Sequence, residues 1–175
     1  NTIGGRLTGS DNYNHAADWA VYMFRKWGLE AEKIHVGDIP VGFNRGPWFG
    51  KMINGEESLH FTTPSYTAGT KGVQRGHVVM EPKSTQELER MKHTIKGAWV
   101  LIGGKSTGWP IDYSERGDAK RAEIIAKNDS IIAENMKLRG TGKKPAPLIE
   151  EPALFYKEMI QAGALGIIQS APVPI

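Results

Sequence analysis

The length, composition and charge of the chain exclude several classes of protein. Of its 175 residues, 39% are hydrophobic and 23% are charged, which is typical of one globular domain or of a domain plus part of a neighbour. The net charge of +3 comes from 22 basic and 19 acidic residues that are interspersed, so we expect no nucleic-acid partner. The absence of cysteine excludes disulfide bonds, thiolate zinc sites and cysteine nucleophiles. No apolar run approaches the roughly 20 residues that a membrane span needs.

Both ends of the sequence are expected to be cut. The chain begins at Asn1 rather than at a methionine, shows no signal segment, and ends with Ala171–Ile175 directly after an apolar run. We therefore expect that an upstream piece has been removed and that the gene product continues past this end.

The first predicted element is an amphipathic helix from Asp11 or Asn14 to Trp27, where apolar side chains recur at helical spacing. Ser10 and Asp11 can each cap its start, and Gly28 is a typical residue just past a helix end. Because such a helix buries its apolar face only against other structure, we expect it to need a partner surface.

Two short strands and a loop are predicted to follow this helix. Residues 29–39 alternate loosely between apolar and polar side chains, and Leu59, Phe61 and Thr63 alternate in the same way. The stretch 40–55 between them is rich in glycine, proline and aromatic residues and is predicted to be a loop.

The second half of the chain predicts the order strand, helix, strand, helix, helix, strand. Its first strand is His77–Met80, and Ser84 with Glu87 has the spacing of a capping box that opens a short helix, which ends before Gly97. The unbroken apolar run Ala98–Ile102 predicts a strand that is buried on both faces.

The remaining predicted elements are a long helix, a linker, a second helix and a final strand. Ser114 can cap the long helix, which is predicted to run to about Arg139 and to bury one narrow stripe. A basic linker, 141–147, precedes a helix over Pro152–Ala162, and Gly166–Gln169 completes the last helix-to-strand unit. This order predicts a fold of the α/β (α+β) class.

No catalytic or metal-binding constellation stands out in the sequence. None of the five histidines has a second histidine at metal-binding spacing, and no Gly-x-Ser-x-Gly motif presents a serine nucleophile. We therefore assign no catalytic residue and no metal ligand in this chain, although ligands distant in sequence can meet in a fold.

The segment Gly103–Thr107 follows a predicted buried strand and matches a phosphate-binding loop only in part. The earlier glycine that such a loop requires is replaced by Trp99, and Gly108–Pro110 breaks the helix that should follow. We expect a polar turn that leaves Lys105 and Trp109 exposed for substrate or partner contacts. A small phosphate-ligand enzyme that uses Lys105 is a further alternative.

The aromatic residues Trp48 and Phe49 lie in the glycine-containing loop 44–50. Side chains of this kind either anchor a loop to its own domain or contact a ligand or a neighbouring domain. Trp48 is therefore a third candidate contact residue. The basic residues within 137–144 are expected to form a solvated helix end rather than a polyanion site.

Two sets of segments point to a known family. The first set lies near the start of the chain and consists of Arg6–Ser10, Ala16–Trp19 and Trp27–Leu29. It resembles the opening of the catalytic domain in secreted two-zinc aminopeptidases and carboxypeptidases, a family that also contains glutamate carboxypeptidases and the inactive transferrin receptor ectodomain.

The second set consists of Ala68–Gly72, Lys96–Leu101 and Ala162–Ile168. It resembles the signature segments of a protease-associated domain. In these peptidases that domain is inserted between the first helix and strand of the catalytic domain and its metal-binding core, and the two sets follow the same order here.

The resemblance implies a division into domains. Residues 1–55 would be the incomplete N-terminal edge of a zinc-peptidase catalytic domain, a helix–strand piece. Residues 56–175 would be a protease-associated domain, with a small mixed β-sheet or barrel flanked by helices. The helical segment 114–140 would be an insertion, because the stretch 103–147 is longer than the usual core of such a domain.

The resemblance also implies a function. The chain would be the non-catalytic part of an exported, periplasmic or extracellular, zinc-dependent exopeptidase, either an aminopeptidase or a carboxypeptidase. There it would shape substrate access or mediate protein contacts, homodimer contacts among them. Two zinc ions would lie in the full-length parent and none in this chain, and the partners would be the rest of the peptidase domain and its peptide substrate. The alternative is a freestanding peptide- or protein-binding module that uses the loops around Trp48 and Trp109.

Overall fold

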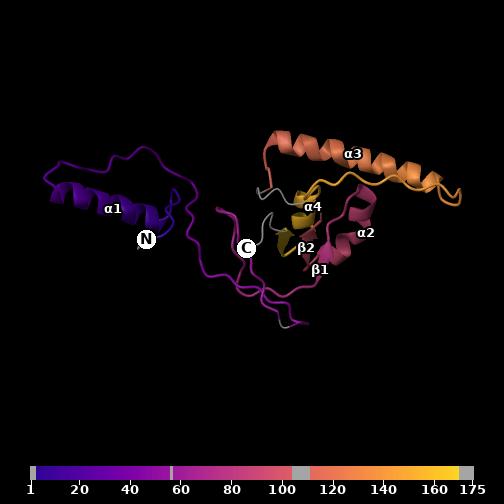
Figure 1. Cartoon of the computed structure of the whole chain (residues 1–175), viewed down its shortest axis with the longest axis horizontal. Helices are drawn as coiled ribbons and strands as arrows, with labels where there is room; N and C mark the ends of the chain where they lie inside the picture. Colours follow the sequence, from indigo (N-terminus) through magenta and orange to yellow (C-terminus); the bar gives the residue numbers. More distant parts are fainter. Residues whose placement is uncertain (1–2, 56, 104–110, 170–175) are drawn as a thin grey trace. The chain divides into compact units, whose positions relative to one another are not determined.

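The computed structural model describes residues 3–55, 57–103 and 111–169, and the chain forms two compact units, Asn1–Gly69 and Thr70–Ile175. Unit 1 contains one helix, α1, and unit 2 contains the described strands and the other helices (Figure 1). The elements are α1 (Asp11–Lys26), β1 (Val78–Met80), α2 (Thr85–Ile95), β2 (Trp99–Ile102), α3 (Glu115–Lys137), α4 (Tyr156–Gln161) and β3 (Gly166–Gln169). The assignment of residues 1–55 and 56–175 to separate domains stays a prediction.

The predicted first helix is confirmed as α1. The hydroxyl of Ser10 accepts a hydrogen bond from the backbone N–H of Tyr13 at 3.2 Å and so caps the helix start. Gly28 follows the helix with a φ of +82°, the left-handed conformation in which helices commonly end. No residue of α1 is buried, and Trp27 at its end is 62% exposed. Within unit 1, therefore, the apolar face of α1 is at most half-buried.

The two strands predicted after α1 are wrong. Residues 29–39 form no strand, and Ile34 and Val36 in this stretch are 75% and 96% exposed. In place of the strand predicted at 59–63, the structure has one isolated antiparallel bridge between Lys51 and Ser58. A strand is stable only when neighbouring strands satisfy its backbone groups, and alternation of side chains alone does not supply such a neighbour.

The sheet of unit 2 has the strand order β1-β2-β3, and both pairings are parallel. Val79 lies opposite Val100, and Val100 lies opposite Ile167. All three strands were predicted, and with their connecting helices they confirm the α/β class. The prediction that the second strand is buried on both faces is wrong, because Val100 and Ile102 on one face of β2 are buried whereas Trp99 and Leu101 on the other are half-buried. Within the described residues this sheet is parallel rather than the predicted mixed sheet or barrel, because each connection between neighbouring strands is a crossover that contains a helix.

Two glycines turn the chain from a helix into a strand in the same way. Gly97, after α2, has a φ of +73°, and Gly163, after α4, has a φ of +93°. The backbone N–H of Gly97 donates to the carbonyl of Gly163 at 2.9 Å, and that of Leu165 donates to the carbonyl of Ala98 at 2.8 Å. The starts of β2 and β3 are therefore held side by side before the ladder begins.

The hydrophobic core lies on the face of β2 that carries Val100 and Ile102, which are both buried. Alternate residues of a strand share one face, so these two side chains point the same way. Helices α2 and α3 and the segment that leads into α4 cover this face. The core members besides these two are Leu88, Ile95, Ile124, Ala153, Leu154, Phe155, Tyr156 and Met159.

The long predicted helix is confirmed as α3, capped by Ser114, and its buried stripe contains polar residues. The buried positions are Gly117, Arg121, Ile124 and Asn128, while Ile125, Ile131, Ile132 and Leu138 are half-buried. Arg121 is buried because its guanidinium donates to Asp118 at 2.6 Å and lies 4.7 Å from the ring centroid of Tyr156 in α4. Polar contacts as well as apolar packing therefore attach α3 to the sheet.

Two asparagines of α3 hold the returning segment against the helix. The side-chain amide of Asn128 donates to the carbonyl of Ile149 at 3.1 Å and accepts from its N–H at 2.8 Å, and Asn135 makes the same reciprocal pair with Ala146 at 2.7 and 2.8 Å. Asn128 is fully buried and donates also to the carbonyl of Lys83 at 2.9 Å. In Figure 1 the segment after α3 accordingly runs back beside the helix.

The last predicted helix begins later than expected. The sequence predicts helix over Pro152–Ala162, whereas α4 covers only Tyr156–Gln161. Ala153 has a φ of +55°, which a helix cannot contain, and Phe155 has a non-helical φ of −112°. The backbone N–H of Ala153 instead donates to Glu81, so a tertiary hydrogen bond overrides the local preference.

We expect Asn128→Ala to lower the free energy of unfolding by about 2–4 kcal/mol, because it removes three hydrogen bonds of a fully buried side chain and leaves the backbone groups of Lys83 and Ile149 without these partners. Asn135→Ala is the matched control, since it removes the same kind of pair at an exposed position and should cost about 1 kcal/mol or less. Urea unfolding followed by circular dichroism measures both. Equal losses for the two variants would contradict the proposed role of Asn128.

Candidate functional site

A buried carboxylate lies at the carboxyl ends of the strands of unit 2. Glu81 follows β1 directly and is 6% exposed. Its Oε1 accepts the N–H of Gly103, just after β2, at 3.1 Å, and its Oε2 accepts the N–H of Ala153, before α4, at 2.8 Å. The side chain thus joins three segments of the chain at the edge of the sheet where α/β proteins commonly bind ligands.

Burial changes the ionisation of Glu81. Desolvation raises the pKa of this carboxyl from 4.5 to about 7, and the hydrogen bonds from Ala153 and Gly103 and the charge of Lys83 offset only part of this effect. A carboxyl group with a pKa near neutrality is of the kind that serves as a general base or acid.

The contacts of Glu81 favour a structural role over a catalytic one. Both of its oxygens already accept hydrogen bonds from backbone N–H groups, and the neighbouring Lys83 forms an ion pair with Glu150 at 3.0 Å. A general base needs an oxygen that can take a proton from a substrate. In this structure, therefore, Glu81 connects the ends of β1 and β2 with the segment before α4.

Two of the three predicted contact residues, Lys105 and Trp109, lie outside the described residues. The third, Trp48, is described and belongs to unit 1, where its indole N–H donates to the carbonyl of Phe61 at 3.1 Å. Its side chain is 46% exposed. Trp48 therefore anchors its own loop and still presents a large aromatic surface to solvent.

Trp48 is part of a cluster that the sequence pattern does not indicate, and we call it the Arg45 cluster. Its members are Phe43, Arg45, Trp48, Thr62, Thr63 and Tyr66. The guanidinium carbon of Arg45 lies 5.2 Å from the ring centroid of Trp48 and 5.7 Å from that of Phe43. The ring of Phe43 also contacts that of Tyr66, with centroids 5.5 Å apart.

The polar contacts of the Arg45 cluster hold its members in place. The Nη1 of Arg45 donates to the hydroxyls of Thr62 and Thr63 at 3.2 and 3.3 Å. The hydroxyl of Tyr66 donates to the carbonyl of Thr8 at 2.8 Å, which links the cluster to the segment before α1. Arg45 is therefore held in place at the surface of unit 1, where few other side chains make tertiary contacts.

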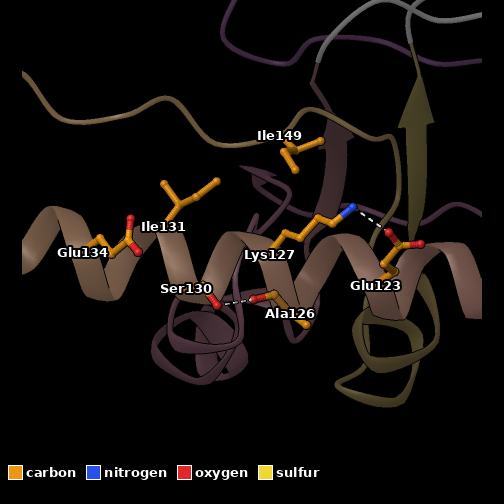
Figure 2. A pocket seen from close by; sticks show the side chains of 7 residues that line it. All are labelled: Glu123, Ala126, Lys127, Ser130, Ile131, Glu134 and Ile149. Atoms are coloured by element: carbon orange, nitrogen blue, oxygen red, sulfur yellow. Dashed lines mark hydrogen bonds and ion pairs between the residues drawn. The ribbon is translucent and has the colours of Figure 1, made fainter.

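A groove runs along α3 in unit 2 (Figure 2). It has a volume of about 500 Å³, is open to solvent, and is lined by Glu123, Ala126, Lys127, Ser130, Ile131, Glu134 and Ile149. Lys127 forms an ion pair with Glu123, and the hydroxyl of Ser130 donates to the carbonyl of Ala126 in its own helix. Because these polar groups already have partners, the groove offers few directed contacts to a ligand.

Among the described residues, no group of three or more histidine, aspartate or glutamate side chains is arranged to hold a metal ion. His77, for example, contacts the backbone carbonyl of Thr94 at 2.7 Å, and His35 lies 3.5 Å from Asp38. Across the described part of the chain, none of the helices is both long enough and apolar enough to pass through a membrane.

No protein-family model, curated protein or solved structure matches this chain. Family and function therefore remain predictions, which rest on the residues of the chain and on the resemblance of its segments.

The sequence pattern did not identify Glu81 or Arg45 as site residues. For Glu81 the usable signal was a charged residue directly after a predicted strand, just before Pro82. For Arg45 the signal was a basic residue between Phe43 and Trp48 in the glycine-rich loop. Neither signal is specific, because the hydrogen-bond partners lie 22 and 72 positions away for Glu81 and 17 and 18 positions away for Arg45.

We expect Glu81 to make the protein less stable as the pH rises from about 4.5 to about 7. In this window the unfolded chain has lost the Glu81 proton and the folded chain retains it, so the folded state binds more protons. The contribution of Glu81 to the free energy of unfolding is fully present below pH 4.5, the pKa of this group in the unfolded chain. It is lost as the pH rises through the folded pKa of about 7, a change of about 3 kcal/mol.

The measurement is urea unfolding between pH 4 and pH 8 of the wild type and Glu81→Gln, which cannot titrate at this position. The variant should lack this part of the pH dependence, whatever its absolute stability. Glu150→Gln is the control, because it removes an exposed carboxylate that pairs with the same Lys83 and should keep the slope. Parallel pH profiles for wild type and Glu81→Gln would contradict the prediction.

Proposed function

We propose that this chain is the non-catalytic, protease-associated part of an exported zinc-dependent exopeptidase, where it borders the active-site cleft or mediates protein contacts. The observation that carries the proposal is the resemblance of its segments to the opening of a two-zinc peptidase domain and, after it, to a protease-associated domain. The α/β fold of unit 2 is compatible with this proposal.

The places of two resembling segments in the fold support the proposal. Lys96–Leu101 contains the turn at Gly97 and most of β2, and Ala162–Ile168 contains the turn at Gly163 and most of β3. The two segments pair in parallel along the sheet, with Trp99 opposite Gly166. Residues that resemble a domain signature therefore form one continuous structural feature, the adjacent starts of two strands.

The exposed apolar face of α1 supports the proposed partner, the remainder of a peptidase domain. Trp19, Tyr22 and Trp27 are each more than half exposed, and Phe24 is 44% exposed. An amphipathic helix gains most of its stability from packing of its apolar face, so α1 is expected to dock on a larger surface. A peptidase core would provide that surface.

Zinc chemistry is not assigned to residues of this chain. The described residues provide no cluster of ligands, and the two zinc ions of the proposed parent would be held by residues outside it. We propose that this chain borders or covers the active-site cleft of the parent, and we assign no catalytic step to its side chains.

A freestanding binding module is the alternative function, and the exposed Trp48 favours it. The two possibilities differ in what they require of α1, since a freestanding module would keep that apolar helix exposed. An α1 that is covered by a peptidase core therefore favours the peptidase proposal, and an α1 that stays exposed favours the freestanding module.

We expect this chain, supplied with zinc, to hydrolyse neither aminoacyl nor dipeptide substrates above the rate of a zinc-only blank. The reason is that the two-metal site which activates water in such enzymes needs ligands that we assign elsewhere. A chromogenic peptidase assay measures this. Turnover that copurifies with the folded chain and is removed by a chelator would overturn the proposal.

We also expect the coding sequence that follows the codon for Ile175 to encode a His-x-Asp segment within roughly the next hundred residues, since this segment supplies zinc ligands in the family that the chain resembles. Sequencing of that region tests the point. A stop codon shortly after this position would favour the freestanding binding module instead.

A further inference from the structure

The Arg45 cluster holds a guanidinium in a fixed orientation. The aromatic rings of Phe43 and Trp48 lie within 6 Å of its central carbon, and the hydroxyls of Thr62 and Thr63 accept from the same terminal nitrogen, Nη1. Trp48 is itself fixed by the hydrogen bond from its indole to Phe61. An arginine side chain on a surface normally samples many rotamers, so this arrangement has already lost much of its freedom.

One edge of this guanidinium is unused. The two hydroxyl contacts occupy Nη1, whereas the N–H of Nε and one N–H of Nη2 point in parallel along another edge of the planar group. Among the residues that the structure describes, no acceptor contacts Nε or Nη2, and Arg45 forms no ion pair. The side chain is exposed, so this edge can be reached from solvent.

We propose that Arg45, with Phe43 and Trp48, forms a binding site for an organic carboxylate. The two parallel N–H groups match the spacing of the two carboxylate oxygens, and such charge-assisted pairs are strong and directional. The fixed orientation lowers the entropy lost on binding. The exposed ring of Trp48 gives apolar surface for the carbon skeleton that carries the carboxylate, which favours an organic acid over an inorganic anion.

The carboxylate has two sources in a peptide, namely the free C-terminus and an acidic side chain. Both present the same two oxygens, so the cluster alone does not separate them. The site lies wholly within unit 1, and the proposal is independent of the peptidase proposal because it requires only this chain.

The test is a titration of the full chain followed by ¹H–¹⁵N NMR of the Nε–H of Arg45 and the indole N–H of Trp48. The probes are N-acetylglycine for the C-terminal carboxylate, N-acetylglutamate α-amide for the side-chain carboxylate, and N-acetylglycinamide, which has none. Ionic strength is held constant with sodium chloride. We expect saturable shifts of both signals with one or both acids, with dissociation constants on the order of 1–10 mM because the site is exposed and screened.

The two acids identify the source of the carboxylate. Binding of N-acetylglycine alone assigns the site to peptide C-termini, and binding of both acids assigns it to carboxylates in general. Equal shifts with the amide, or no shift of the Arg45 Nε–H at 50 mM of either acid, would overturn the proposal.

Substitutions separate binding from a purely structural role. Arg45→Lys keeps the charge but has no parallel pair of N–H groups, so affinity should fall about tenfold or more. Arg6→Gln, which removes an exposed arginine of the same unit, should leave affinity unchanged. The Trp48 indole signal reports whether the cluster remains folded in each variant. If Arg45→Lys disrupts the cluster, the comparison of acid with amide in the wild type still decides the question.

Discussion

The buried carboxylate of Glu81 is the interaction on which the arrangement of unit 2 depends. It accepts hydrogen bonds from Gly103, 22 residues away, and from Ala153, 72 residues away, and so connects the ends of β1 and β2 with the segment that enters α4. Asn128 adds a second buried polar connection, since it binds the backbone of Lys83 and Ile149. A sheet of three short strands would otherwise depend on few ladder hydrogen bonds. Side chains that bind backbone groups therefore add to the strand ladder and to the apolar core in holding these segments together.

The two units are stabilised by different means. Unit 2 has an apolar core between β2 and its helices, whereas in the described part of unit 1 Ser10 is the only buried residue. Unit 1 relies on a helix cap, on the aromatic contacts around Arg45 and on hydrogen bonds at its surface. Surface contacts of this kind contribute little stability each. The exposed apolar face of α1 and the exposed Arg45 cluster both accompany this lack of a core.

The proposals for function address different features of the chain. The peptidase proposal rests on resembling segments that include the turns at Gly97 and Gly163, and on the uncovered face of α1. The carboxylate site rests on the geometry of the Arg45 cluster. If both hold, a surface that recognises carboxylates would belong to the non-catalytic part of an exopeptidase, where it would contact the substrate or an acidic segment of a partner before or during cleavage.

The sequence by itself determined the features that depend on neighbours a few residues apart. The caps at Ser10, Ser84 and Ser114 and the helices they open belong to this class, because a cap or a helical period involves residues within one or two turns. Only the tertiary structure decided which alternating segments become strands and where α4 begins. It alone placed Glu81, Asn128 and Arg45 in contact with their partners. The physical reason is that a strand, a buried carboxylate and a fixed guanidinium each require groups from distant parts of the chain, and the identity of those groups is not contained in any local pattern.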